Sequence, residues 1–152
     1  MVQKKNKKIL DIEKNGHSLG YVSSDVAPGY SSAGLEEIGS IDQVSQFDEI
    51  YAVDVLQRVS HLHLNEFLTT LNCALNPTGV LKIKAPDFHH ISTNYQRNAD
   101  CGSFVETLLG SKNEVKSVFD KPFLEKIIKE SGFSKVTKWE EKGDDIFFVA
   151  KK

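Results

Sequence analysis

The chain has 152 residues, a formal net charge of −2, 39% hydrophobic residues and 26% charged residues. This length is sufficient for one domain with a buried core, and the composition is typical of a globular protein. The small net charge argues against an extended nucleic-acid surface, and no apolar run approaches the ~20 residues that span a bilayer. We therefore expect a single cytoplasmic domain over residues 1–152, with neither membrane nor nucleic acid as a partner.

The amino-terminal part predicts two strands joined by a short loop. Residues 8–12 (KILDI) indicate a first strand and residues 21–26 (YVSSDV) a second. The segment between them, which contains Gly16 and Gly20, is too short for the usual crossover helix. The sequence therefore predicts that the first crossover helix is missing.

The clearest unit is a strand, a helix and a second strand over residues 49–85. Residues 49–55 are rich in Ile, Tyr and Val and predict a strand that is buried on both faces. A helix follows, with Ser60 as its expected cap, because apolar residues recur at three- and four-residue steps. These residues are Leu64, Phe67, Leu68, Leu71 and Leu75. Residues 76–79 (NPTG) indicate a turn, and residues 80–85 a parallel strand reached by a right-handed crossover.

The carboxyl-terminal part predicts a helix and a closing hairpin. Residues 91–116 are polar and are interpreted as a lid or an acceptor loop. A helix is expected from Pro122 to Gly132. Strands over residues 136–141 and 146–150 flank a turn at residues 142–145. The predicted fold is α/β, with a mostly parallel, twisted sheet and an antiparallel terminal strand.

Several short motifs resemble the class I S-adenosylmethionine-dependent methyltransferases. They are GYVSSDV at residues 20–26, AVDVLQRV at 52–59, NPTG at 76–79, APD at 85–87 and SGF at 131–133. The resemblance implies a Rossmann-like class I methyltransferase fold with S-adenosylmethionine as cofactor and a small molecule as methyl acceptor. Relatives with a similarly short first loop imply a sugar or glycan precursor as that acceptor.

The resemblance also implies which residues contact the cofactor. Asp11, Glu13 and Gly16 belong to the first loop, beside the methionine part of the cofactor. Glu13 and Asn15 stand where the family carries glycines, whose small size lets the backbone approach the ligand. Glu13 either crowds and repels the cofactor carboxylate or binds the cofactor amino group.

Four further cofactor-contacting residues are expected after later strands. Asp25 would accept hydrogen bonds from both ribose hydroxyls, and its alternative role is to start the following turn. Asp42 resembles the acidic position that contacts the adenine amino group, and Ile41 lies either against the adenine or in the core. Asp54 would contact the cofactor or the acceptor, or else cap a turn.

The acceptor site is expected after the second strand of the central unit. Asp87, His89 and His90 follow that strand, and ligands of parallel sheets bind beyond the carboxyl ends of the strands. A neutral imidazole could accept the proton of the methyl acceptor, so these residues are the catalytic candidates. The alternative is that both histidines face solvent.

No metal site is expected. His61 and His63 are two residues apart, which does not place both on one helix face. Cys73 and Cys101 lack a CxxC spacing and are interpreted as free thiols.

Two functions remain open from the sequence. The first is methyl transfer to a small molecule, which GYVSSDV and APD favour. The second is a catalytically inactive binding or scaffolding protein, as a homodimer or with a partner methyltransferase, which Glu13 and Asn15 favour.

Overall fold

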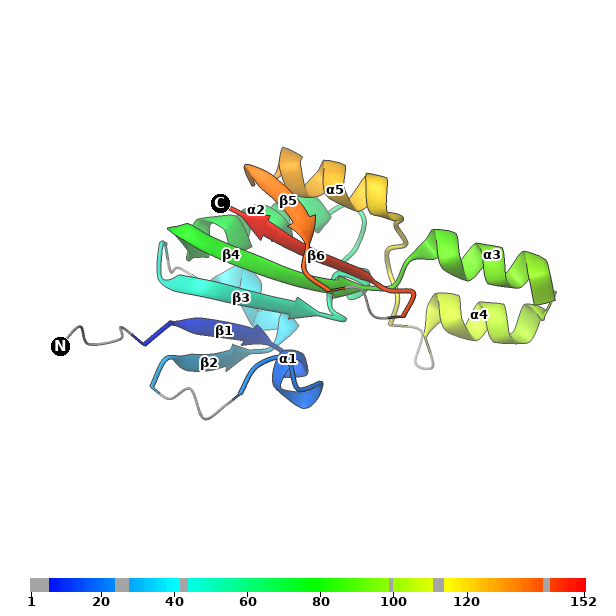
Figure 1. The fold of residues 1–152 in the computed structure, drawn as a ribbon, viewed down its shortest axis with the longest axis horizontal. Coiled ribbons are helices and arrows are strands. Elements are labelled where there is room, and N and C mark those ends of the chain that lie inside the picture. Colours follow the sequence, from blue (N-terminus) through cyan, green and yellow to red (C-terminus); the bar gives the residue numbers. More distant parts are fainter. Residues whose placement is uncertain (1–5, 24–27, 42–43, 99, 111–113, 141–142) are drawn as a thin grey trace.

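The computed structural model describes residues 6–23, 28–41, 44–98, 100–110, 114–140 and 143–152. These residues form a six-stranded sheet of order β2-β1-β3-β4-β6-β5 (Figure 1). β1, β2, β3 and β4 are parallel to one another, and β6 is antiparallel to both β4 and β5. The strands are β1 Ile9–Ile12, β2 Tyr30–Ala33, β3 Phe47–Val53, β4 Leu75–Ala85, β5 Lys135–Lys138 and β6 Ile146–Lys151.

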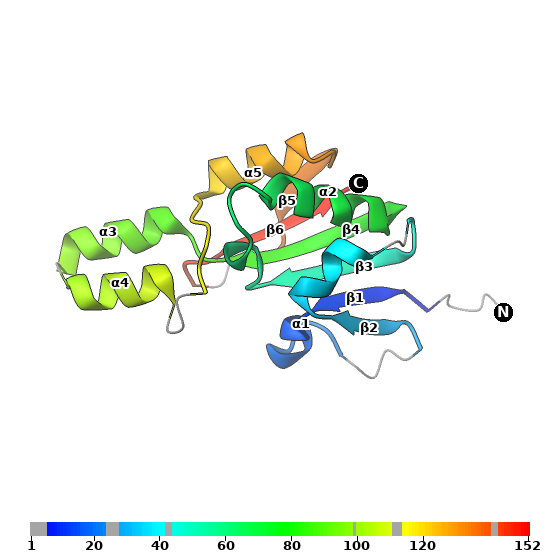
Figure 2. The same cartoon turned by 180° about the vertical axis from the view of Figure 1, so that it is seen from behind.

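Helices cover one face of this sheet. Figure 2 shows α2 and α5 in front of the strands, with the η1 segment beside them. The main core lies between this layer and the sheet, and it includes Leu68, Leu71 and Leu124, which are fully buried. The helical segments are α1 Asn15–Ser18, η1 Leu35–Ser40, η2 Leu56–Arg58, α2 Leu64–Ala74, α3 Phe88–Asn98, α4 Cys101–Leu109 and α5 Lys121–Glu130.

The predicted central crossover unit is confirmed. β3 and β4 are adjacent and parallel in the middle of the sheet, with Ile50 opposite Leu81. Leu64, Leu68 and Leu71 of the expected stripe are inaccessible to solvent in α2, and Phe67 is partly buried. Leu75, expected in the same helix, is instead the first residue of β4.

Two details of that unit were predicted wrongly. Ser60 does not cap α2 with its side chain, since the N-cap is His63 and its side chain makes no capping bond. Residues 76–79 do not form a free turn between helix and strand. They belong to β4, whose register with β3 shifts there because Phe47 pairs with Leu75 while Glu49 pairs with Val80.

The closing elements agree with the sequence. α5 begins after Asp120, whose carboxylate accepts a hydrogen bond from Phe123 N at 2.9 Å. The helix ends before Gly132, whose φ of +101° is readily adopted only by glycine. β6 is the expected reversed strand, and it lies between β4 and β5.

The second strand was predicted in the wrong place. Residues 21–23 are not strand, residues 24–27 lie outside the described part, and β2 is Tyr30–Ala33. YVSSDV has the stronger β propensity, but pairing with β1 selects the serine-rich segment, where Ser31 also donates to the Ile9 carbonyl at 3.2 Å. The expected lack of a full crossover helix is confirmed, because the four-residue α1 is the only helix among the described residues of this connection.

Residues 91–116 are not a loop, contrary to the prediction. Most of them form α3 and α4, which extend together beyond the end of β4 as a helical hairpin (Figure 1). Tyr95 and Phe104 join the two helices with ring centroids 4.5 Å apart.

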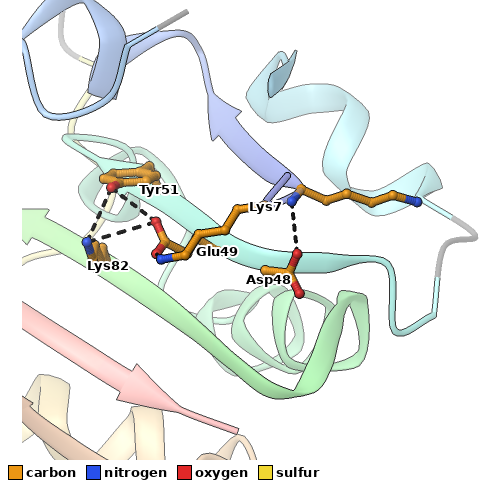
Figure 3. A network of polar contacts seen from close by, with 6 residues as sticks. Lys7, Asp48, Glu49, Tyr51 and Lys82 are labelled. Carbon is orange, nitrogen blue, oxygen red and sulfur yellow. Dashed lines mark hydrogen bonds and ion pairs between the residues drawn. The ribbon is translucent and has the colours of Figure 1, made fainter. Parts of the chain in front are cut away.

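The sheet face opposite α2 and α5 carries a polar network (Figure 3). The Glu49 carboxylate accepts hydrogen bonds from Lys7 Nζ at 2.7 Å and from the Tyr51 hydroxyl at 3.3 Å. The same hydroxyl accepts a hydrogen bond from Lys82 Nζ at 3.3 Å. The hydrogen bond and charge of Glu49 raise the pKa of Lys7. Since Glu49 lies in the first half of β3, these contacts join strands away from the edge where β1, β3 and β4 end.

Among the described residues, no helix combines the length and apolar character needed to cross a bilayer.

Candidate functional site

The candidate site lies at the edge where the parallel strands end, called here the carboxyl edge. Ligands of open parallel sheets bind at this edge, near the point where successive strands are added on opposite sides. β1 occupies that point, because its neighbours are β2 and β3. Figure 1 shows α1 and the α3–α4 hairpin at this edge.

The loop after β1 is organised by Asp11. This carboxylate is fully buried and accepts hydrogen bonds from Gly16 N at 2.9 Å, His17 N at 2.8 Å and the Tyr30 hydroxyl at 2.8 Å. Burial and the hydrogen bond to Asp11 raise the pKa of Tyr30. The structure therefore gives Asp11 three partners within the protein and places it beneath the loop.

Gly16 is required by close packing. A Cβ at this position would lie 2.8 Å from Asp11 Oδ1 and 3.3 Å from Tyr51 Cβ. Asn15 holds the loop to β3, because its Nδ2 donates a hydrogen bond of 2.8 Å to the carbonyl of Val53, the last residue of that strand. The loop is thus held against both β1 and β3.

Glu13 and Lys14 adopt the left-handed backbone conformation without being glycine. Their φ values are 60° and 56°. Such residues cost on the order of 1–3 kcal/mol each and persist where the surroundings impose them, most often at functional sites. The chain therefore combines a backbone conformation that suits glycine with a carboxylate and an ammonium group.

The Glu13 side chain reaches the end of β2. Its Oε1 accepts from Leu35 N at 2.6 Å and lies 3.8 Å from the guanidinium of Arg58 in η2. A Cβ at Gly34 would lie 3.4 Å from Glu37 Oε1 and 3.9 Å from Glu13 Oε1, so both carboxylates flank this glycine.

An open cleft surrounds these groups, called here the β2 cleft. Its volume is about 250 Å³. It is lined by Glu13, Lys14, Ser32, Ala33, Gly34 and Glu37. The cleft thus presents two carboxylates and one ammonium group at the end of β2.

Asp54 lies between the β2 cleft and the rest of the carboxyl edge. Its backbone φ is 55°. Both oxygens of its carboxylate accept hydrogen bonds from Lys84 Nζ, at 2.9 and 3.0 Å. Lys84 also lies 3.2 Å from Asp145. Burial alone would lower the pKa of Lys84, but Asp54 and Asp145 together raise it.

A second cleft, called here the α3 cleft, lies between the end of β4, the helical hairpin and the start of β6. Its volume is about 370 Å³. Its lining consists of Pro86, Asp87, His90, Ile91, Asn94, Tyr95, Asp100, Phe104, Thr107, Asp144 and Asp145.

The three predicted catalytic residues lie at or beside this cleft. Asp87 is 8% exposed, lines the cleft and accepts from His89 N at 3.0 Å. His90 lines it with Nε2 at 3.0 Å from Asp144. His89 is the second residue of α3 and is not among the lining residues.

The other predicted cofactor contacts are only partly described. Asp25 and Asp42 lie outside the described residues. Asp25 was predicted to lie at the end of the second strand. This placement is wrong, because β2 ends at Ala33. Ile41 packs against the main core as the C-cap of η1, which was its stated alternative.

Sequence reasoning missed Glu37, Arg58 and the Asp144–Asp145 pair as site residues. The available signal for Glu37 was the acidic pair in GLEEIG directly after β2, which went unused because β2 was misplaced. Arg58 lies in the AVDVLQRV motif, but the sequence assigned it no role. Its contact with Glu13 spans 45 positions and has no local signature.

No group of three metal-ligating side chains occurs in the described part of the chain. There, Cys73 and Cys101 are both free and exposed, as predicted.

Comparison with known proteins identifies the fold. No protein-family model matches the sequence, and no curated protein matches it. Solved structures do match. The CurJ carbon methyltransferase superposes with a TM-score of 0.67 and 14% identity over 99% of this chain and 50% of that one.

Two further structures agree with this comparison. A SAM-dependent methyltransferase from Thermotoga maritima gives a TM-score of 0.66 and 14% identity over 97% of this chain and 83% of that one. PigF, whose structure contains SAH, gives a TM-score of 0.62 and 14% identity over 96% of this chain and 50% of that one. The chain spans half the length of CurJ and PigF. It has the fold of the class I S-adenosylmethionine-dependent methyltransferases.

Proposed function

We propose that the chain binds S-adenosylmethionine in the β2 cleft and transfers its methyl group to a small molecule. The observation that carries the proposal is the convergence of Glu13 and Glu37 on Gly34 at the end of β2. Two carboxylates there offer the acceptors that vicinal ribose hydroxyls require.

The side chains of the cleft suit the charged parts of this cofactor. Its ammonium group needs an acceptor, which either glutamate supplies, and its carboxylate needs a cationic donor. Lys14 lines the cleft, and Arg58 lies 3.8 Å from Glu13 at its border. When bound, the cofactor supplies an electrophilic methyl group on a sulfonium.

The loop conformation supports the same proposal. Glu13 and Lys14 keep φ values near +60° although neither is glycine. The carboxylate of Glu13 is engaged by Leu35 N. This contact directs Glu13 to the end of β2, which supports its role as an acceptor for the cofactor rather than a group that crowds the cofactor carboxylate.

The protein's further contribution is to position the acceptor. The α3 cleft opens at the same edge of the sheet, and Asp87 and His90 line it. We propose these residues, with His89 beside them, as the acceptor side, where an imidazole can take a proton. A sugar or glycan precursor remains the acceptor expected from the resemblance.

A catalytically inactive binding or scaffolding protein is the second candidate. One specific observation favours it. Gly16 N and His17 N, which could otherwise donate to a ligand at the first loop, both donate to Asp11. A site that keeps the fold but presents fewer free donors would bind the cofactor weakly or not at all.

Titration calorimetry with S-adenosylhomocysteine separates the two candidates. We expect binding by the unmutated protein and a roughly three- to tenfold weaker binding by Glu13→Gln, which corresponds to the difference between a charge-assisted and a neutral hydrogen bond. Glutamine retains an oxygen for Leu35 N but removes the charge. Glu36→Gln is the matched control, because Glu36 is exposed in η1 and does not line the β2 cleft.

Absence of binding by the unmutated protein at millimolar ligand would support the scaffolding function. Equal affinities for Glu13→Gln and Glu36→Gln would show that binding occurs without the proposed contact.

A further inference from the structure

The α3 cleft has features that define the class of its ligand. Its volume of about 370 Å³ is within the range of small-molecule sites. Three separate parts of the chain build it, namely the end of β4, the α3–α4 hairpin and the start of β6. It is therefore a concave site at the carboxyl edge.

The lining carries an excess of negative charge. It contains four carboxylates and, among the described residues, neither lysine nor arginine. The four are Asp87, Asp100, Asp144 and Asp145. Lys84 lies behind the lining and is shared between Asp54 and Asp145, so it balances one carboxylate at most.

The helical hairpin adds two aromatic rings to the lining. Tyr95 and Phe104 lie with ring centroids 4.5 Å apart and planes inclined by 33°. Both line the cleft, and Tyr95 is 37% exposed. Aromatic faces attract ammonium groups through their quadrupole and also pack against the apolar part of a ligand.

We infer that the α3 cleft binds a small amine in its ammonium form, and that this amine is the methyl acceptor. The second half of this statement rests on the proposed function. An anionic acceptor would be repelled by Asp87, Asp144 and Asp145, and a neutral polyol would leave their negative charge unused. An amino sugar or an arylalkyl amine would supply the ammonium group that the lining requires.

Methylation of such an amine places one demand on the protein. Its nitrogen must release a proton before its lone pair bonds to the methyl carbon, while the electrons of the broken carbon–sulfur bond remain on sulfur. His90 lines the cleft beside Asp144 and can take that proton.

Binding of matched ligand pairs tests the inference without cofactor. One pair is 2-phenylethylamine and 2-phenylethanol, and the other is glucosamine and glucose. Ligand-observed NMR titration should give roughly tenfold tighter binding for at least one amine than for its hydroxyl counterpart, reflecting charged rather than neutral hydrogen bonds. The pair with the larger ratio distinguishes an amino sugar from an arylalkyl amine.

Two variants locate the binding. Asp144→Asn should weaken amine binding about two- to fivefold, the effect of one partly exposed charge. Glu106→Gln, the matched control, removes an exposed carboxylate of α4 outside the lining and should leave affinity unchanged. Equal affinities for amine and alcohol in both pairs, equal effects of the two variants, or no binding by either amine would overturn the inference.

Failure of this inference is distinguishable from failure of the proposed function. If S-adenosylhomocysteine binds but neither amine does, the proposed cofactor site stands and the amine site falls. If the amines bind in the predicted manner but S-adenosylhomocysteine does not, the α3 cleft is an amine site on a protein that does not bind the cofactor.

Discussion

Replacing Asp11 with asparagine should destabilise the protein by about 2–4 kcal/mol, because an amide cannot accept all three hydrogen bonds of the buried carboxylate. Asp11 accepts Gly16 N through Oδ1, and His17 N and the Tyr30 hydroxyl through Oδ2, at 2.8–2.9 Å. Asparagine has one side-chain oxygen. If that oxygen stays with Gly16, the new amide nitrogen faces the N–H of His17.

The magnitude follows from the two kinds of donor. The hydroxyl of Tyr30 can rotate and accept from the amide nitrogen, whereas His17 N–H cannot change its role. One buried donor without a partner costs about 1–3 kcal/mol, and the remaining contacts lose the strength that the charge provides. Against a total stability of about 5–15 kcal/mol, this loss is readily measurable.

Urea denaturation followed by circular dichroism is the appropriate assay. We expect a lower midpoint with an unchanged slope. Tyr30→Phe is the matched comparison, because it removes one donor and leaves Asp11 with two, so it should cost only about 0.5–1.5 kcal/mol. A change below about 0.5 kcal/mol in Asp11→Asn would refute the organising role of this carboxylate.

Three other predictions concern the stability of the fold. Leu68→Ala should cost about 2–5 kcal/mol by chemical denaturation, since Leu68 is fully buried, and a smaller loss would contradict tight packing of α2. Asp120→Ala should cost about 0.5–2 kcal/mol through loss of the α5 cap, and an unchanged midpoint would show that the cap contributes nothing. Burial, aided by Asp11 and Glu49, raises the pKa of Tyr30 and Tyr51 above 10.0. Their stabilising effect is complete below pH 10 and is lost as pH rises further, because the unfolded phenols ionise first. Ultraviolet titration should show Tyr30 and Tyr51 ionising only with unfolding, and burial also raises the pKa of Tyr21. Ordinary titration of all four tyrosines would contradict this.

The sequence predicted the buried elements well because their periodicity reflects burial. β3 is a nearly continuous apolar run, β4 alternates and α2 has a period of 3.6, and all three lie in the middle of the structure. α5 was found through its proline and Gly132, whose roles are local. Such features require no knowledge of distant contacts.

Other parts of the fold depend on contacts that have no local signature. β2 is a serine-rich strand selected by pairing with β1, whereas YVSSDV has better propensity but its described residues, 21–23, are not strand. α3 and α4 pack mainly on each other through Tyr95 and Phe104. Neither choice can be deduced from propensity alone.

A site residue was placed correctly only where the strand before it was predicted correctly. Asp87 and His90 were placed correctly at the end of β4, because that strand was predicted correctly. Glu37 was missed because β2 was misplaced. The left-handed conformations of Glu13 and Lys14 contradict residue preference and are visible only in the structure.

The most direct test of the proposed cofactor site is a backbone amide NMR titration of the isotope-labelled protein with S-adenosylhomocysteine. If the β2 cleft holds the cofactor, the largest shifts should occur at Glu13–Gly16 and at Gly34 and Leu35, with smaller shifts near Glu37. Unchanged spectra at millimolar ligand, or shifts confined to elements away from the carboxyl edge, would contradict the proposed site.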